Sequence, residues 1–439
     1  MLEQKYISGQ TAVKIARSIE AAVSAGKIDA GEQLPTVREL AKQLGVSGAT
    51  VAAAYRTLQE RGVTIAEGRR GTRIRPSAPA APVPPPPPRG VRDLAGGNPD
   101  RELLPDLQRH LRRLRVRQRG YGEELNDREL VALARRQFRA DGVPARNIAI
   151  VGGALDGIER VLREQLRPGD RVLVEDPCFA GVLDLIAAQA LVPVPVAIDD
   201  EGMLPAALAR AMRSGGQAII VTPRAQNPTG AAMGRSRARS LRAILRSRPD
   251  LLLIEDDHAG RVAGAPYVTL VEPSRTRFAV LRSVSKPLGP DLRVALLAGD
   301  AQTVAALERR QTIGIRWVSH ILQALVATLL RDRSVQRQLA AAEKTYSTRR
   351  QALLRALAAH GIDAHGKSGL NVWIPVPDES AIVQSLFQSG WAVHAGESYR
   401  IASGPAIRVT VASLAPADAK RLARDVAASV ASQGRTLAA

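Results

Sequence analysis

Three polar stretches follow apolar, strand-like runs, and their side chains suit chemistry on an aldehyde. Lys286 comes after the apolar run 278–281, and a lysine at the end of a strand can form an imine with an aldehyde. Asn227 follows the run 218–222, Asp256 follows the run 251–254, and the three stretches are about thirty residues apart. Ligands of open α/β sheets bind at such strand ends, so the spacing predicts one shared site there.

Further residues could hold a phosphate and an aromatic ring near this lysine. Gly153 and Ala154 follow the run 148–151 and open a helix, whose first N–H groups can bind a phosphate. Ser283 and Arg293 flank Lys286 and would add a hydroxyl and a guanidinium to the same phosphate. Phe179 could stack on a ring.

Asp256 would keep a ring nitrogen protonated, and Asn227 would donate to a phenolate oxygen. Each residue also has an ordinary interpretation: a surface lysine, a core phenylalanine, a helix-capping or surface aspartate, or a plain Asn-Pro turn.

The composition favours a large intracellular protein that meets polyanions. The chain has 439 residues and a formal net charge of +20, with 62 Lys+Arg against 42 Asp+Glu. Such a balance suits nucleic acid, although a solvated arginine-rich surface would also produce it. The one cysteine, Cys178, excludes a disulfide framework, and no uncharged run is long enough to span a membrane. We therefore expect a soluble, cytoplasmic protein.

Residues 1–75 are predicted to form a winged helix-turn-helix. Apolar residues at helical spacing end at Gly26, Thr36 can begin a second helix, and Ser47 can begin a third after a turn at Gly45. Two strand-like runs with a basic tip follow, as in a hairpin. The third helix would enter the major groove, while the side chains expected at phosphates are Arg38, Arg69, Arg70 and Arg73. The alternative is a small helical interaction domain.

Residues 76–92 are predicted to be a proline-rich linker, since five consecutive prolines, 84–88, favour a polyproline II spacer. In residues 93–439, strand-like runs alternate with helical patterns, which favours a large, mostly parallel α/β sheet covered on both faces. From about residue 330 to 439 the pattern mixes helices and short strands, which indicates a smaller α+β subdomain.

The N-terminal motifs resemble the GntR superfamily of bacterial regulators. Residues 34–41, Leu-Pro-Thr-Val-Arg-Glu-Leu-Ala, and residues 46–51, Val-Ser-Gly-Ala-Thr-Val, match its two-helix pattern. The resemblance implies DNA contacts by Arg38, Ser47, Thr50 and the wing residues Arg69, Arg70, Gly71 and Thr72. Gly48 stands where many members have an arginine, so this position cannot read a guanine edge.

The rest of the chain resembles the fold-type I aminotransferases that use pyridoxal 5′-phosphate. The resemblance implies that Lys286 bonds to the cofactor aldehyde, that Asp256 pairs with the pyridine nitrogen, and that Asn227 meets the phenolate oxygen. It places Phe179 on the ring, and it assigns the phosphate to Gly153, Ala154, Ser283 and Arg293.

Two further residues follow from the same resemblance. Tyr121 would reach the neighbouring subunit's phosphate, and Arg408 would bind a substrate carboxylate. His258 replaces a common tyrosine beside the cofactor, where its imidazole could contact the same phenolate oxygen.

A GntR-type head on such a body is identified as the MocR arrangement, which implies a head-to-tail, domain-swapped homodimer. The preferred hypothesis is a regulator that binds double-stranded DNA and senses pyridoxal phosphate or an amino compound. Alternatives are an aminotransferase with a vestigial head, for which half-reactions remain plausible, and a dimerisation scaffold without a cofactor. A run of arginines at 109, 112, 113, 115, 117 and 119 is either a solvated helix face or a second DNA contact.

Overall fold

The computed structural model describes residues 6–29, 31–60, 63–66, 71–74 and 87–436. The chain divides into two compact units, and the main division falls in the proline-rich stretch. We call the described residues up to 74 the head and those from 87 the body. Arg69, Arg70 and linker residues 76–86 lie outside the described residues. No helix of the described part is both long and apolar enough to cross a membrane.

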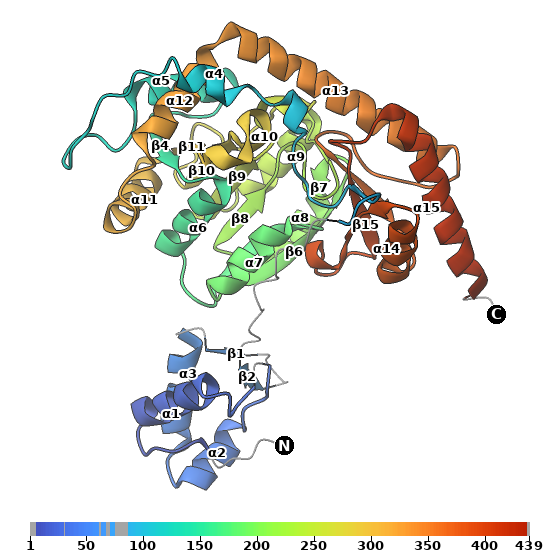
Figure 1. Ribbon diagram of the computed structural model, residues 1–439. Helices are drawn as coiled ribbons and strands as arrows, with labels where there is room; N and C mark the ends of the chain where they lie inside the picture. Colours follow the sequence, from blue (N-terminus) through green and yellow to red (C-terminus); the bar gives the residue numbers. More distant parts are fainter. Residues whose placement is uncertain (1–5, 30, 61–62, 67–70, 75–86, 437–439) are drawn as a thin grey trace. The chain divides into compact units, whose positions relative to one another are not determined.

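The head has the elements of a winged helix-turn-helix (Figure 1). They are α1 Ala12–Ser24, α2 Val37–Leu44, α3 Gly48–Glu60, β1 Thr64–Ala66 and β2 Thr72–Ile74. A reciprocal pair of hydrogen bonds between Thr36 and Glu39 begins α2, and Gly45 ends it with a left-handed φ of 64°. Ser47 begins α3, because its Oγ accepts from the backbone N–H of Thr50 at 3.1 Å. Both capping predictions are confirmed.

The body is built on an eight-stranded mixed sheet with the order β4-β11-β10-β9-β8-β5-β6-β7. Its strands are β4 Asn147–Val151, β5 Arg171–Asp176, β6 Val192–Asp199, β7 Gly202–Met203, β8 Ala218–Val221, β9 Leu252–Asp257, β10 Phe278–Ser283 and β11 Ala295–Gly299. The central strands β10, β9, β8 and β5 are parallel neighbours, whereas β11 runs antiparallel to both β10 and β4. The strand-like runs 148–151, 218–222, 251–254 and 278–281 of the sequence therefore correspond to β4, β8, β9 and β10.

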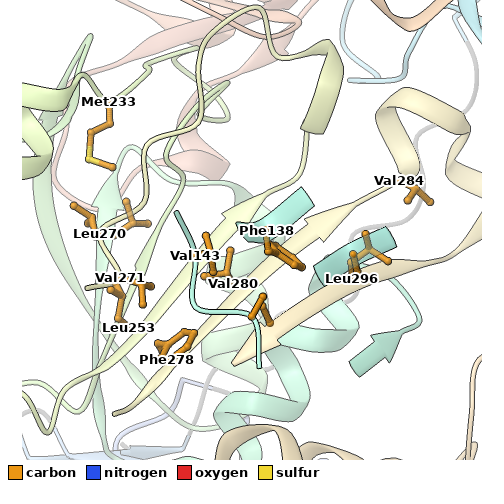
Figure 2. Close-up of a cluster of buried hydrophobic side chains, with 14 of the residues drawn as sticks. Phe138, Val143, Met233, Leu253, Leu270, Val271, Phe278, Val280, Val284 and Leu296 are labelled. Carbon is orange, nitrogen blue, oxygen red and sulfur yellow. The ribbon is translucent and has the colours of Figure 1, made fainter. Parts of the chain in front are cut away.

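Helices pack around this sheet in the order expected for an α/β domain. They are α4 Leu107–Leu111, α5 Arg128–Ala140, α6 Ala154–Gln165, α7 Ala180–Ala188, α8 Pro205–Arg213, α9 Arg235–Leu245, α10 Ser285–Leu288, α11 Ala301–Ile313 and α12 His320–Arg331. Figure 2 shows part of the main core, where Leu253 of β9, Val280 of β10 and Leu296 of β11 pack with Phe138 of α5. The arginine run is not a helix face, since α4 ends at Leu111 and the chain from Arg113 to Arg119 is irregular.

A smaller α+β subdomain follows the sheet. It contains α13 Arg333–Ala358, β12 Asn371–Pro375, α14 Glu379–Gln388, β13 Trp391–Ala392, β14 His394–Ala395, β15 Ala406–Thr410 and α15 Pro416–Thr436. The predicted boundary near residue 330 falls just before a helix shared by two cores, because Leu339 of α13 packs in the main core and Leu353 in the smaller one. The first strand of the body, β3 Arg92–Asp93, pairs with β13 and so belongs to this subdomain.

Candidate functional site

The parallel sheet brings the three predicted polar stretches to one edge. Strands β8, β9 and β10 are adjacent and parallel, so their carboxyl ends meet there. Two local expectations need correction. Asp256 lies inside β9, which continues to Asp257, rather than after the strand. Lys286, which the sequence places where a strand gives way to a loop, lies in α10, a single helical turn. Asn227 lies in a turn, as its sequence indicates.

Asp256 is a buried carboxyl group without a complete set of partners. Its side chain is 6% exposed, and Oδ1 has no hydrogen-bond partner in the described part of the chain. Burial, and then the charge of Asp257, raise the pKa of Asp256 to about 7. Burial also raises the pKa of nearby Glu175 to about 8. An unpaired buried acid is costly, so this carboxyl group suits an external donor such as a ring N–H.

The start of α6, where Gly153 and Ala154 are predicted to bind a phosphate, lies on the same face of the sheet as Asp256. Leu281 of β10 is directly opposite Asp256 in the strand register, and α6 packs closely on it: a Cβ on Gly157 would lie 2.3 Å from Leu281 Cδ2. At the start of α6, a Cβ on Gly153 would lie 2.9 Å from Arg293 Nη2. The guanidinium therefore lies against the helix N-terminus, whose first N–H groups lack helical acceptors.

Lys286 is linked to a loop near the start of the body. Its Nζ donates a 2.7 Å hydrogen bond to the carbonyl oxygen of Gly97. Burial and the nearby charge of Arg408 lower the pKa of Lys286 to about 8. Burial and the Lys286 charge lower the pKa of His258 to about 4, so the imidazole is neutral near pH 7.

Arg408 approaches the same site from the smaller subdomain. It lies in β15 with 4% of its surface exposed, and its guanidinium carbon is 5.0 Å from the centre of the Tyr399 ring. Its Nη1 donates to Asn227 Oδ1 at 3.2 Å, and its Nη2 donates to the carbonyl of Ala95. Its buried Nε has no partner among the described residues. A planar cation with an unused donor can bind a carboxylate.

Of the remaining predicted residues, Phe179 and Ser283 lie near the cluster of Lys286, Asn227 and Arg408, whereas Tyr121 does not. Phe179 packs against Trp373 and Tyr399, the aromatic residues beside Arg408. Ser283 is buried, and its Oγ accepts from the backbone of Ser285 next to Lys286. Tyr121 contacts neither Lys286 nor Arg408.

Tyr121 is 82% exposed. It packs edge-on against Trp317 at 5.7 Å, and the Arg316 guanidinium lies 5.0 Å from its ring centre.

Sequence reasoning missed three groups of residues. The first is the loop of residues 95–98, whose signal was the glycine pair Gly96-Gly97 shortly before Pro99. The second is Asn371, which donates to Asn227 Oδ1 at 3.2 Å and so helps orient that amide. The third is the pair Arg224 and Arg282. Arg282 is a charged residue inside the apolar strand β10, whereas Arg224 follows β8 and carries no such signal.

The structure describes only some of the residues of the head that are predicted to contact DNA, because Arg69 and Arg70 lie outside the described residues. Arg38 of α2 and Ser47 before α3 are exposed, and Ser47 Oγ lies 2.9 Å from Thr50 Oγ1. Gly71 and Thr72 lie at the hairpin, where Thr72 O accepts from Leu34 N at 2.8 Å. Arg73 has an internal contact, since its Nη1 donates to Gly31 O at 3.3 Å. The expected phosphate contact of Arg73 stays a prediction.

Comparison with known protein families assigns both parts of the chain. Residues 120–426 match the family "Aminotransferase class I and II", and residues 11–74 match "Bacterial regulatory proteins, gntR family". A curated relative, the vitamin B6 salvage pathway transcriptional repressor PtsJ of Salmonella typhimurium, is 41% identical over 423 residues, which cover 96% of this chain and 98% of the relative. The chain belongs to the MocR-type regulators.

A second regulator and a solved enzyme structure also match most of this MocR-type chain. The HTH-type pyridoxine biosynthesis transcriptional regulator PdxR of Corynebacterium glutamicum is 27% identical over 352 residues, covering 77% of this chain and 76% of the relative. Among solved structures, an archaeal alanine:glyoxylate aminotransferase is 22% identical with a TM-score of 0.72, covering 78% of this chain and 91% of that one. This likeness establishes the fold-type I aminotransferase fold of the MocR body.

Proposed function

We propose that this protein is a transcription regulator that binds operator DNA through its head and pyridoxal phosphate through its body, and that it represses genes of vitamin B6 metabolism. The observation that carries the proposal is the buried, unpaired carboxyl oxygen of Asp256 at the sheet edge that also holds Lys286. The direction of regulation rests on the 41% identical vitamin B6 salvage repressor. A regulator of this kind acts in the cytoplasm, beside the DNA.

The residues present fit pyridoxal phosphate. The Asp256 carboxyl group lacks a donor that a protonated pyridine nitrogen supplies, and the glycine-lined start of α6 with Arg293 suits a phosphate. The cofactor would supply an aldehyde carbon for bonding to an amine and a ring that accepts electrons.

The surroundings of each residue in the candidate site suggest what that residue does. The lowered pKa of Lys286 leaves a useful share of Nζ as the neutral, nucleophilic amine at neutral pH. Asn227 accepts two hydrogen bonds at Oδ1, so its Nδ2 is the group that can donate to a phenolate oxygen. Neutral His258 could contact the same oxygen. Arg408, with an unused Nε, would bind the carboxylate of an amino compound.

The surface around Tyr121 supports a homodimer. Tyr121 packs against Trp317. Ile313 and Ile315, which shortly precede Trp317 in the sequence, are 79% and 57% exposed. A monomer rarely leaves such residues in water together. A second copy would cover them and place its own Tyr121 near the cofactor phosphate, consistent with the head-to-tail arrangement.

The proposal is tested by operator binding with and without the cofactor. A duplex selected from a random pool by the wild-type protein is titrated with wild type and with Lys286→Ala, each with and without pyridoxal phosphate. We expect the cofactor to change wild-type affinity and to leave Lys286→Ala affinity unchanged. Borohydride reduction should place a pyridoxyl group on Lys286. Wild-type binding that no concentration of cofactor alters would refute the sensing role.

DNA binding by the head makes a separate prediction. Arg38→Ala should weaken binding to all duplexes alike and reduce the slope of log affinity against log salt by about 1, because one phosphate contact is lost. The matched control is Lys42→Ala, which removes another exposed cation near the end of α2. The neighbour Glu39 is unsuitable as a control, because its side chain completes the capping box of that helix. An unchanged salt slope for Arg38→Ala would exclude this contact.

A second candidate function, transamination, is favoured by the joint presence of Lys286, Asp256 and Arg408 at one edge. Sustained conversion of an amino donor and a keto acid, together with no preference among duplexes, would favour the enzyme over the regulator. We expect single half-reactions at most.

A further inference from the structure

A chain of hydrogen bonds runs from the smaller subdomain to the side-chain amide of Asn227. Thr410 Oγ1 of β15 donates to Asn371 Oδ1 of β12 at 3.0 Å, and Asn371 Nδ2 donates to Asn227 Oδ1 at 3.2 Å. Arg408 Nη1 donates to the same Asn227 oxygen, also at 3.2 Å. We call Asn371 and Thr410 the amide relay. They are directly opposite each other in the register of β12 and β15, so the sheet itself brings the two side chains together.

The direction of every bond in this chain follows from Arg408. A guanidinium can only donate, so the Asn227 atom that it contacts is the oxygen. The Asn371 atom that contacts this oxygen must then be the amide nitrogen, which leaves the Asn371 oxygen to accept from the Thr410 hydroxyl. The Asn227 nitrogen therefore lies on the other side of its amide carbon, where it donates to no acceptor among the described residues.

The amide relay is a polar pair between two strands of an apolar core. Asn371 is 7% exposed and Thr410 is 4% exposed, while their neighbours Val372 and Val409 belong to the core of the smaller subdomain. Asparagine is disfavoured in strands. Two apolar side chains of the same shape would pair across these strands about as well, because a buried hydrogen-bonded pair adds little net stability. The fold does not require a polar pair here, whereas the orientation of the Asn227 amide does.

Arg408 alone would hold the Asn227 amide less firmly. The torsion between Cβ and Cγ of an asparagine is soft, so a single hydrogen bond leaves the amide plane free to turn. Under the proposed function Arg408 also binds a ligand carboxylate, which competes for its N–H groups. Asn371 is buried and its own oxygen is occupied by Thr410. Asn371 is therefore the donor that remains on Asn227 when Arg408 is engaged.

We propose that Asn371 and Thr410 are positioning residues that turn the Asn227 nitrogen toward the bound cofactor. They thereby make the site prefer a ring with an ionised oxygen beside its aldehyde. This inference rests on the proposed function. A fixed N–H donor binds an ionised acceptor more strongly than a neutral one. A ring that lacks the oxygen leaves the donor unpaired, and an unpaired polar group of the site is what rejects such an analogue.

Two ring compounds test the amide relay on the full-length protein. The probes are pyridoxal 5′-phosphate and 3-deoxypyridoxal 5′-phosphate, which keeps the aldehyde, the phosphate and the ring nitrogen but lacks the oxygen. Absorbance titrations give both dissociation constants, and their ratio measures the preference for the oxygen. The intrinsic reactivity of each aldehyde is the same for every variant, so a change in this ratio between variants reports the contact with the protein.

The decisive variant combines Asn371→Leu with Thr410→Val. It replaces both partners by apolar side chains of similar shape, so urea unfolding should give the wild-type stability. We expect the preference for pyridoxal phosphate to fall roughly tenfold, because a hydrogen bond to a charged acceptor is weakened. Asn227→Ala should lower the preference at least as far.

A second variant and a control complete the test. Asn371→Asp keeps the size and polarity of the side chain but can only accept, so it too should lower the preference. The matched control combines Ser385→Ala with Ser429→Ala, which removes another polar pair of the smaller subdomain, between α14 and α15, whose hydroxyl oxygens lie 2.7 Å apart. Its preference should equal that of the wild type.

The outcomes separate the amide relay from the proposed function. If borohydride traps a pyridoxyl group on Lys286 but the preference stays at the wild-type value in both variants, Asn371 and Thr410 only join two strands. The inference is then wrong and the cofactor role stands. Equal weakening of both ring compounds is the same negative result, because their ratio does not change. No pyridoxyl adduct in the wild type would overturn the proposed function and this inference with it.

Discussion

The two faces of strand β9 use the same side chain in opposite ways. Asp256 and Asp257 are neighbours, both buried, and point to opposite sides of the sheet. Asp257 is saturated by protein partners, whereas Asp256 has an oxygen with none among the described residues. The difference teaches that burial and residue type do not mark a functional acid; the missing partner does.

The saturated face is a compact ionic cluster. Asp257 is paired with Arg282 at 2.7 Å and with Arg224 at 2.8 Å, and Arg282 also meets Asp141 at 2.7 Å. The Tyr267 ring lies 5.1 Å from the Arg282 guanidinium and 5.3 Å from that of Arg224. Burial alone would raise the pKa of Asp257, but the two arginines outweigh it and hold the pKa well below its usual value. This face fixes structure.

The largest expected effect comes from breaking the saturated face. Asp257→Asn leaves two buried guanidinium groups without their shared anion, and breaking such a pair costs about 3–5 kcal/mol. We expect the free energy of unfolding, measured with urea at fixed protein concentration, to fall by that order. A loss below about 1 kcal/mol would mean that water or other groups neutralise the arginines.

The matched substitution on the opposite face of β9, Asp256→Asn, should lower the affinity for the cofactor rather than the stability. Asp256→Asn removes a carboxyl group that has no partner on one oxygen, so stability should stay equal or rise slightly. Loss of a charged hydrogen bond to the pyridine nitrogen is worth about 1.5–3 kcal/mol, or roughly 10–100-fold in cofactor affinity. Absorbance titration with pyridoxal phosphate measures it. Equal affinity in wild type and variant would remove Asp256 from the cofactor site.

The raised pKa of Asp256 also predicts a pH dependence of stability. The pKa of Asp256 is raised from 3.8 to about 7, so the folded protein keeps a proton that the unfolded chain has released. Between about pH 4 and 7 its contribution makes stability fall as pH rises, by up to about 1.4 kcal/mol per unit.

Glu175, with a pKa raised to about 8, acts in the same direction, so the informative quantity is wild type minus Asp256→Asn. Urea unfolding at several pH values measures it in the cofactor-free protein. A difference that does not vary with pH would mean that Asp256 titrates normally.

The sequence by itself determined the order of elements and which strand ends lie together. Alternating apolar runs predicted the strands of the sheet, Thr36 and Ser47 predicted where two helices of the head begin, and the spacing of Asn227, Asp256 and Lys286 predicted a common edge. Such features are local or follow from parallel strand order, so periodicity and turn residues are enough to reveal them.

Only the tertiary structure decided which acid is free, where the linker attaches and what holds the lysine. Asp256 and Asp257 are equivalent in sequence, and their separation depends on Arg224 and Arg282 from other segments. The pairing of β3 with β13 joins residues about three hundred positions apart, and the 95–98 loop contacts Lys286 and Arg408 across 189 and 313 positions of the sequence. Long-range pairings of this kind arise from packing of the whole chain, and no local pattern encodes them.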